Sequence, residues 1–328
     1  MKRLLCALAL LVLTAAAPGW RWSLPDGMAP PPVPAANPMS AARVELGRRL
    51  FYDADLSLDG TLACSSCHEQ RHGFADSVSA RPGVHGDPGR RNASGLANVG
   101  WLSPLTYADP TLATLEAQAL VPLVGETPVE MGMKGMDAEL ARRLSADRCY
   151  RTQFARAFPG SKGRIDLASV VAALAAFQRT MVSAASPWDD FRRGDAAALT
   201  PLAQQGVALF ESRGCAACHA GPQLTDLRFH GFAPPQARDP GLVERTGRAE
   251  DAGRFRTPSL RNVAVGGPWW HDGSAKTLDA AIRRHAAAVA VTDTDMPALL
   301  ALLESFTDPH FITDPRLSRP DRACGKKL

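Results

Sequence analysis

Two copies of the sequence C-x-x-C-H stand in this chain of 328 residues, and they contribute Cys64, Cys67, His68, Cys215, Cys218 and His219. This spacing is typical of c-type haem attachment, in which two thiols form thioethers with the porphyrin and the adjacent imidazole binds iron. A C-x-x-C pair also occurs in zinc sites and in thioredoxin-like redox pairs, but neither needs a histidine directly after both copies. The chain is therefore predicted to carry two covalent haems, with His68 and His219 as iron ligands.

The start of the chain has the composition of an export signal. A basic beginning is followed by a short apolar run, so residues 1–18 are predicted to be a signal peptide and the mature protein to be periplasmic. The run is too short to span a bilayer comfortably, and no stable membrane span is expected after its removal. Residues 19–39 form a proline-rich leader, which cannot be helical.

Two cysteines remain once the haem cysteines and the signal peptide are set aside. These are Cys149 and Cys324, which could pair in an oxidising compartment and tie the C-terminal tail to the first half of the chain. The sequence leaves both the paired and the unpaired state open.

Apolar residues recur at helical spacing through most of the chain, whereas few strands are indicated. Helices are expected over residues 40–52, 112–121, 138–158, 165–182, 278–289 and 294–306, and another from Thr200 that leads into the second haem motif. Long loops rich in glycine and proline separate them. The predicted fold class is mainly α, with two cytochrome c-like domains at 40–195 and 196–328. A net charge of +4 gives no indication of nucleic-acid binding.

Further motifs surround these landmarks: Leu46-Gly47-Arg48-Arg49-Leu50-Phe51-Tyr52-Asp53, Arg91-Asn92, Gln118-Ala119-Leu120-Val121-Pro122, Thr257-Pro258-Ser259-Leu260-Arg261-Asn262-Val263 and His271-Asp272-Gly273. In this combination the chain resembles the bacterial dihaem cytochrome c peroxidase and MauG superfamily. The leader, which ends in Asn37-Pro38-Met39-Ser40, is similar to that of the MbnH-like dihaem enzymes. The resemblance implies two haems that face the domain interface, one in the N-terminal domain reactive with peroxide and one in the C-terminal domain that relays electrons.

The resemblance places Gln118, Pro122 and Glu130 on the distal side of the first haem. A carboxylate there would take a proton from peroxide and return it to the departing oxygen. Glu126 competes for this role, but Val129-Glu130-Met131-Gly132 matches the acid-methionine context of the family, which favours Glu130. His85 lies where some relatives carry a loop histidine that ligates the oxidised first haem; the open form, with His85 as a loop residue, is preferred.

His285 stands seventeen residues after Pro268, the family spacing for the sixth ligand of the second haem. That ligand is methionine in the cytochrome c peroxidases and tyrosine in MauG, and the alternative is a surface histidine. A second imidazole would lower the reduction potential relative to methionine, and this favours MauG-like chemistry.

Two more features follow from the resemblance. Tyr107 lies at or beside the position of a tryptophan that shares charge between the haems in relatives. The side-chain oxygen of Asn92 and the backbone carbonyls of Gly266 and Pro268 match a bridging calcium site.

The preferred hypothesis is an enzyme that uses hydrogen peroxide to build a high-valent dihaem state, which then oxidises a periplasmic partner protein. The first alternative is a cytochrome c peroxidase that takes electrons from a small cytochrome or cupredoxin. The second is a dihaem electron carrier without enzymatic activity, which would close both irons with strong ligands.

Overall fold

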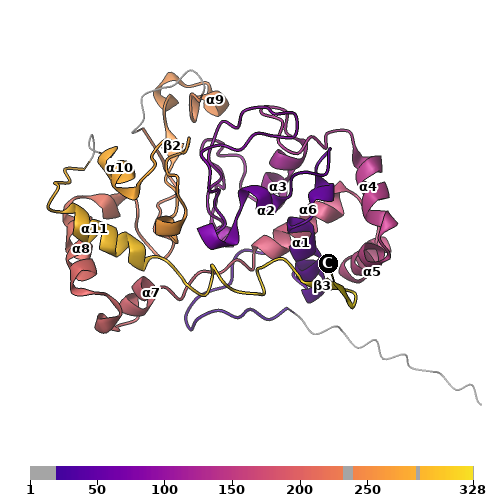
Figure 1. The fold of residues 1–328 in the computed structure, drawn as a ribbon, viewed down its shortest axis with the longest axis horizontal. Coiled ribbons are helices and arrows are strands. Elements are labelled where there is room, and N and C mark those ends of the chain that lie inside the picture. The colour runs from indigo at the N-terminus through magenta and orange to yellow at the C-terminus, as the bar shows by residue number, and fades with distance from the viewer. Residues whose placement is uncertain (1–19, 232–238, 286–288, 328) are drawn as a thin grey trace, which may run out of the picture.

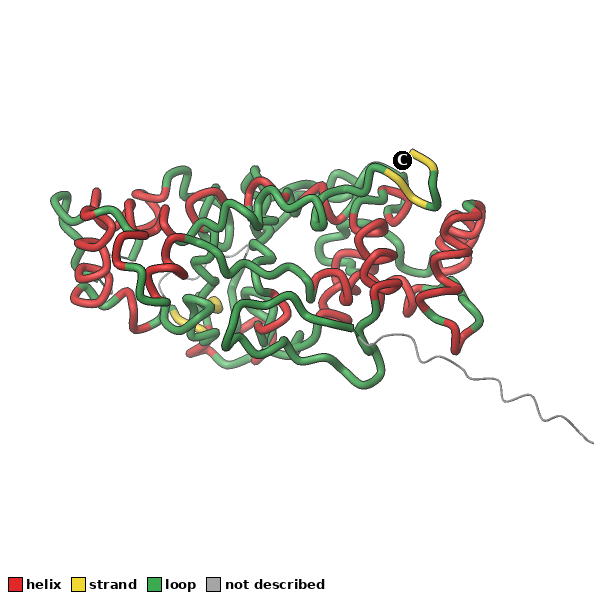
Figure 2. The backbone as a smooth tube through the Cα atoms, turned by 90° about the horizontal axis from the view of Figure 1, so that it is seen from below, coloured by secondary structure: helices red, strands yellow, loops and turns green. Residues whose placement is uncertain are grey.

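The computed structural model describes residues 20–231, 239–285 and 289–327. It is an elongated molecule with helices gathered at its two ends and long loops between them (Figures 1 and 2). The predicted signal peptide, residues 1–18, lies outside the described residues. No helix within the described ranges is long and apolar enough to cross a membrane.

The first group of helices forms one lobe around a large apolar core. Here it is called the N-terminal lobe, and its helices are α1 (Ala41–Phe51), α2 (Cys64–Cys67), α3 (Leu115–Val124), α4 (Asp137–Ala146), α5 (Arg148–Ala157) and α6 (Leu167–Gln178). The first haem motif forms α2. Ser40 caps α1 by accepting a hydrogen bond from the backbone N–H of Arg43, so the helix begins one residue after the start of the expected range 40–52.

The second group of helices packs around a smaller core. This C-terminal lobe contains α7 (Pro187–Arg192), α8 (Pro201–Ser212), α9 (Val243–Thr246), α10 (Leu278–Arg283) and α11 (Met296–Ser305). The second haem motif begins in a 3₁₀ turn at Cys215–Ala217. Two short antiparallel strand pairs, β1 (Phe229–His230) with β2 (Phe255–Arg256) and β3 (Arg322–Ala323) with β4 (Lys326–Lys327), complete the described structure.

The two lobes repeat one helix crossing. In the N-terminal lobe α1 packs on α6, and a Cβ added at Gly47 would lie 1.9 Å from the carbonyl oxygen of Ala173. In the C-terminal lobe α8 packs on α11, and a Cβ at Gly206 would lie 2.2 Å from the carbonyl oxygen of Ala298. Only glycine permits such close helix contact. In each crossing the first helix, α1 or α8, precedes the haem motif of its lobe, and the second, α6 or α11, follows it.

The end of the chain returns to the N-terminal lobe. Phe311 packs against Phe74 with ring centroids 5.4 Å apart, and the hydroxyl of Tyr52 donates to the carbonyl of Leu317 at 2.7 Å. A disulfide joins Cys149 to Cys324, so the paired state is the one present in the structure. The C-terminal tail, which falls in the predicted domain 196–328, therefore packs against the lobe formed by the predicted domain 40–195.

Several predicted helices differ from the observed ones. The helix expected over 112–121 is shifted to α3 (Leu115–Val124), and that expected over 165–182 is α6, which ends at Gln178. The range 138–158 is divided into α4 and α5, because Asp147 adopts an extended conformation and its side chain caps α5 by accepting from Cys149 N–H at 2.6 Å. The helix expected over 278–289 ends earlier, since α10 stops at Arg283; residues 286–288 of that range lie outside the described residues.

Candidate active site

The second C-x-x-C-H motif lines a cavity of about 380 Å³. Cys215, Cys218, His219 and His285 contribute to its wall, together with apolar side chains that include Phe210 and Leu299. A pocket with many apolar walls and a few polar groups suits a flat, largely apolar macrocycle. The residues present therefore fit a covalent haem at this motif.

Hydrogen bonds fix the tautomers of the two histidines in this cavity. Nδ1 of His219 lies 3.2 Å from the carbonyl oxygen of Leu224, and Nδ1 of His285 lies 2.9 Å from that of Ala281. A carbonyl oxygen can only accept, so Nδ1 carries the proton in both rings and Nε2 is the nitrogen with the lone pair. This is the arrangement that a metal-binding imidazole needs.

The distance between the two rings matches a shared metal ion. The imidazole centroids of His219 and His285 are 6.5 Å apart. Two metal–nitrogen bonds of about 2 Å each, plus the distance from each nitrogen to its ring centre, give a similar separation. Burial lowers the pKa of His219 to about 4, so this imidazole is neutral, as a ligand must be.

The histidine of the first motif is oriented by the same kind of hydrogen bond as that of the second. Nδ1 of His68 donates to the carbonyl oxygen of Phe74 at 2.7 Å. Phe74 has a φ of 60° and Leu224 a φ of 52°. This left-handed conformation is uncommon for residues other than glycine and often marks functional sites. In both lobes, an unusual backbone residue follows the motif and its carbonyl accepts from the motif's histidine.

The cysteines of the first motif are in an environment that disfavours thiolates. Burial raises the pKa of Cys64 and of Cys67 to about 12. A zinc site would hold these side chains as thiolates, whereas a haem thioether is uncharged. The burial of both side chains is compatible with an uncharged thioether at each cysteine.

The structure brings the predicted distal residues together. Gln118 and Pro122 lie one helical turn apart on α3, and the N–H of Met131 donates to the carbonyl of Pro122 at 2.9 Å. This bond places Glu130 beside the end of α3. Burial raises the pKa of Glu130, and its charge in turn contributes to the raised pKa values of Cys64 and Cys67. Glu130 therefore lies close to the first motif.

The alternative acid, Glu126, and the alternative ligand of the first haem, His85, are both exposed. Glu126 is 61% exposed and forms an ion pair with Lys134. His85 is exposed in a loop whose residue Val84 donates its N–H to the carbonyl of Glu130 at 2.9 Å. The loop histidine thus lies beside the distal segment, but its side chain faces solvent in this conformation.

Tyr107 lines the cavity of the second motif, on the side of the N-terminal lobe. Burial raises the pKa of its hydroxyl, so the phenol keeps its proton. The buried Arg256 holds this loop, since its backbone N–H donates to the carbonyl of Tyr107 at 2.7 Å and its Nε donates to that of Thr106 at 3.1 Å. Nothing in the sequence pattern indicates that Arg256 is buried, so its role was not among the predictions.

The three predicted calcium residues, Asn92, Gly266 and Pro268, line this same cavity. The amide nitrogen of Asn92 donates to the carbonyl of Val78 at 2.9 Å, so its side-chain oxygen faces the other way as an acceptor. A buried amide oxygen and two backbone carbonyls are the hard donors that calcium prefers. These residues therefore fit the ion.

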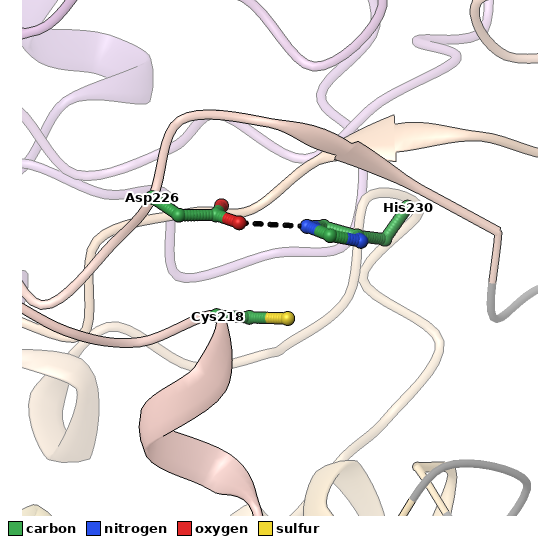
Figure 3. Close-up of side chains that lie close together, drawn as sticks. All are labelled: Cys218, Asp226 and His230. Atoms are coloured by element: carbon green, nitrogen blue, oxygen red, sulfur yellow. Dashed lines mark hydrogen bonds and ion pairs between the residues drawn. The ribbon is translucent and has the colours of Figure 1, made fainter.

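A further cluster contains Cys218, Asp226 and His230, whose possible ligand atoms lie within 4.8 Å of one another (Figure 3). A carboxylate oxygen of Asp226 is 2.8 Å from Nε2 of His230. A metal at this point would need the Cys218 thiolate, which attachment of the haem consumes. The carboxylate–imidazole pair is better understood as part of the polar surroundings of the second haem.

Comparisons with known proteins identify the family of the chain. A family model described as di-haem cytochrome c peroxidase matches residues 41–197. The chain is 33% identical to cytochrome-c peroxidase IdrP1 of Denitromonas iodatirespirans, over 95% of each protein. It is 37% identical to methylamine utilization protein MauG of Methylorubrum extorquens, over 76% of this chain and 70% of that protein.

A crystal structure of a MauG-like protein associated with microbial copper homeostasis has the same fold. The TM-score is 0.87 and the sequence identity is 38%. The match covers 93% of this chain and 100% of the other. The fold and the two haem motifs define a dihaem peroxidase-type oxidoreductase. The chain belongs to the dihaem cytochrome c peroxidase and MauG family. The predicted family, mainly α fold and enzymatic class are confirmed.

Proposed function

We propose that this protein is a periplasmic enzyme that reduces hydrogen peroxide at its first haem and takes the electrons from a partner protein, as MauG-like enzymes do. Cys64 and Cys67 would attach the first haem and His68 would bind its iron. Cys215, Cys218, His219 and His285 would attach and ligate the second.

The observation that carries this proposal is the difference between the two sites. The second motif has another imidazole facing it, with ring centroids 6.5 Å apart. The first has a carboxyl group nearby, Glu130, whose pKa is raised by burial, and its loop histidine His85 is exposed. A closed site that relays electrons and an open site that admits peroxide fit these surroundings. A carrier without enzymatic activity would not need an acid beside one haem.

The side chains at the first site divide the work of peroxide reduction. Bound haem iron supplies the electrons that cleave the O–O bond. Glu130 would accept a proton from the nearer peroxide oxygen and donate it to the farther one, which leaves as water. Gln118 would hold the peroxide by hydrogen bonding, and the ring of Pro122, one helical turn further along α3, would supply an apolar part of the same surface. Each peroxide consumes two electrons and two protons and yields two water molecules.

The residues between the sites would support transfer from one to the other. Asn92, Gly266 and Pro268 would bind one calcium ion and so fasten a loop of the N-terminal lobe to the segment before the His-Asp-Gly sequence. Tyr107 lies in the same cavity with its proton retained. We infer that it lies on the path of charge between the haems, where its oxidation would require loss of this proton, so that charge sharing would be less efficient than through an indole.

The rival function is a cytochrome c peroxidase that must first be reduced. The proposed enzyme and this rival differ in how the fully oxidised protein reacts with peroxide. A gated peroxidase keeps its oxidised first haem closed by a loop histidine, so it cannot react until it is reduced. We expect the oxidised protein to react with one equivalent of peroxide without prior reduction, as followed by stopped-flow absorbance. A reaction that requires prior reduction would favour the gated peroxidase, and no reaction in either state would contradict peroxide chemistry.

A further inference from the structure

A surface groove lies against the cavity of the second motif. It encloses about 730 Å³ between residues 71–79 of the N-terminal half and 264–276 of the C-terminal half. Three residues, His72, Pro268 and Trp269, line both the groove and the cavity. They form a wall one residue thick between the surface of the protein and the space beside His219 and His285.

Trp269 is held firmly in this wall. Its indole N–H donates to the carbonyl of Val263 at 2.8 Å, and its backbone pairs with Ala275 in both directions, at 2.9 and 3.2 Å. The ring lies directly over Gly267, where an added Cβ would be 2.5 Å from the ring carbon Cη2. A fixed indole between two cavities is a suitable path for an electron, because no movement is needed to open it.

His72 closes the other part of the wall. Its Nδ1 donates to the carbonyl of Val265 at 2.8 Å, which joins the two halves of the groove. Its Nε2 accepts a hydrogen bond from Nε of Arg71 at 3.2 Å, so the position of Arg71 is linked to that of the wall.

The groove presents positive charge. Both formally charged residues among its described lining residues, Arg71 and Lys276, are cations. The side chain of Arg71 is 75% exposed, although it pairs with Glu69 at 2.6 Å. Lys276 is exposed and donates to the carbonyl of Gly273 at 2.9 Å, a contact that leaves its charge uncompensated.

The acidic residues next to the groove, Glu69 and Asp76, form hydrogen bonds and ion pairs with other side chains. Glu69 accepts from the hydroxyl of Ser77 at 2.7 Å, and its carboxylate is 3.7 Å from Arg81. Asp76 is buried and pairs with Arg81 at 2.8 Å. The charged residues in and next to the groove are thus three cations, Arg71, Lys276 and Arg81, and two acids, Glu69 and Asp76. A net positive charge remains.

We propose that this groove is the docking surface for the redox partner, that it recognises an acidic patch, and that electrons cross Trp269 into the cavity of the second motif. This inference rests on the proposed function. Two one-electron transfers from the partner, together with two protons, convert one hydrogen peroxide to two water molecules. Complementary charge would hold the donor at the thin wall and speed its association.

Binding of an inert anion tests the recognition step apart from catalysis. Isothermal titration calorimetry with hexacyanocobaltate(III), which does not exchange electrons here, should give a dissociation constant about tenfold larger for Arg71→Glu/Lys276→Glu than for the unaltered holoprotein. The matched control is Arg148→Glu/Arg156→Glu, which reverses two exposed charges on α5 in the far part of the N-terminal lobe (Figure 1). Equal weakening in both variants would overturn the charged-groove proposal.

Small electron donors of opposite charge test the path. With peroxide in excess, the groove variant should oxidise anionic hexacyanoferrate(II) more slowly and cationic hexaammineruthenium(II) no more slowly than the unaltered protein. Trp269→Phe should slow both donors while anion binding stays the same. An unchanged rate in Trp269→Phe would overturn the tryptophan path. If peroxide fails to react even without a donor, the proposed function itself falls, and the binding result still decides whether the groove recognises anions.

Discussion

The imidazole rings of His219 and His285 face each other in one cavity, with centroids 6.5 Å apart and ring planes at 67°. Each ring donates its Nδ1 proton to a backbone carbonyl, so both Nε2 atoms have the electronic form that binds iron. Two imidazoles stabilise ferric iron more than an imidazole and a thioether do. The second haem is therefore expected to have a low reduction potential.

Replacing His285 by methionine should raise that potential. His285→Met should leave the haem attached through Cys215 and Cys218, while the potential rises by on the order of 100 mV because a thioether stabilises ferrous iron. Redox titration followed by absorbance measures the change. His310→Met alters an exposed histidine and serves as the control. Identical potentials in both variants would mean that His285 is not a ligand.

Glu130→Gln should slow the reaction with peroxide by about a hundredfold to ten-thousandfold, because an amide cannot transfer the proton that O–O cleavage requires. Both haems and their resting spectra should be retained. Stopped-flow absorbance gives the rate, and Glu126→Gln, which changes an exposed carboxylate paired with Lys134, is the matched control. If Glu126→Gln has the larger effect, the roles of the two acids are reversed.

The raised pKa of Glu130 predicts the pH dependence of the same step. A buried carboxyl keeps its proton to a higher pH than the ordinary value of about 4.3, so the base form is lost as the pH falls through the raised pKa. Below that pKa the rate should fall about tenfold per pH unit. The pH profile of Glu130→Gln should lose this dependence. A profile that is the same in the unaltered protein and in Glu130→Gln would assign the titration to another group.

The sequence predicted the parts of the site that lie within one motif or at a fixed spacing. The two haem motifs follow from local pattern, and the helix expected over 40–52 is present as α1 (Ala41–Phe51). The position of Gln118 and Pro122 is implied by the resemblance to the family, and the helix expected over 112–121 does not include Pro122, which lies within α3. The cavity that places His285 opposite His219 agrees with a spacing known from the family.

Other features depend on contacts between distant segments. Arg256 is buried by packing against the loop of Tyr107, and the tail returns to the first lobe through Phe311. The groove lined by Trp269 needs both halves of the chain. No periodicity in the sequence encodes such contacts, so only the structure gives them.

Removal of calcium should slow transfer between the haems without releasing either. The ion would join Asn92 to the segment of Gly266 and Pro268, and its loss would loosen the contact between the halves of the chain. Metal analysis should first find about one calcium per protein, the stoichiometry of a single site. After chelation, the spectral change at the second haem should lag behind that at the first. Unchanged kinetics in a sample shown to have lost calcium would limit the ion to a structural role.

An electron paramagnetic resonance spectrum of the fully oxidised protein tests the central claim most directly. The claim is that one haem is open to peroxide while the other is closed by two imidazoles. We predict one high-spin ferric signal from the haem at His68 and one low-spin signal from the haem between His219 and His285. Two low-spin signals would contradict the open first site and favour a carrier or a gated peroxidase. Two high-spin signals would contradict ligation by His285.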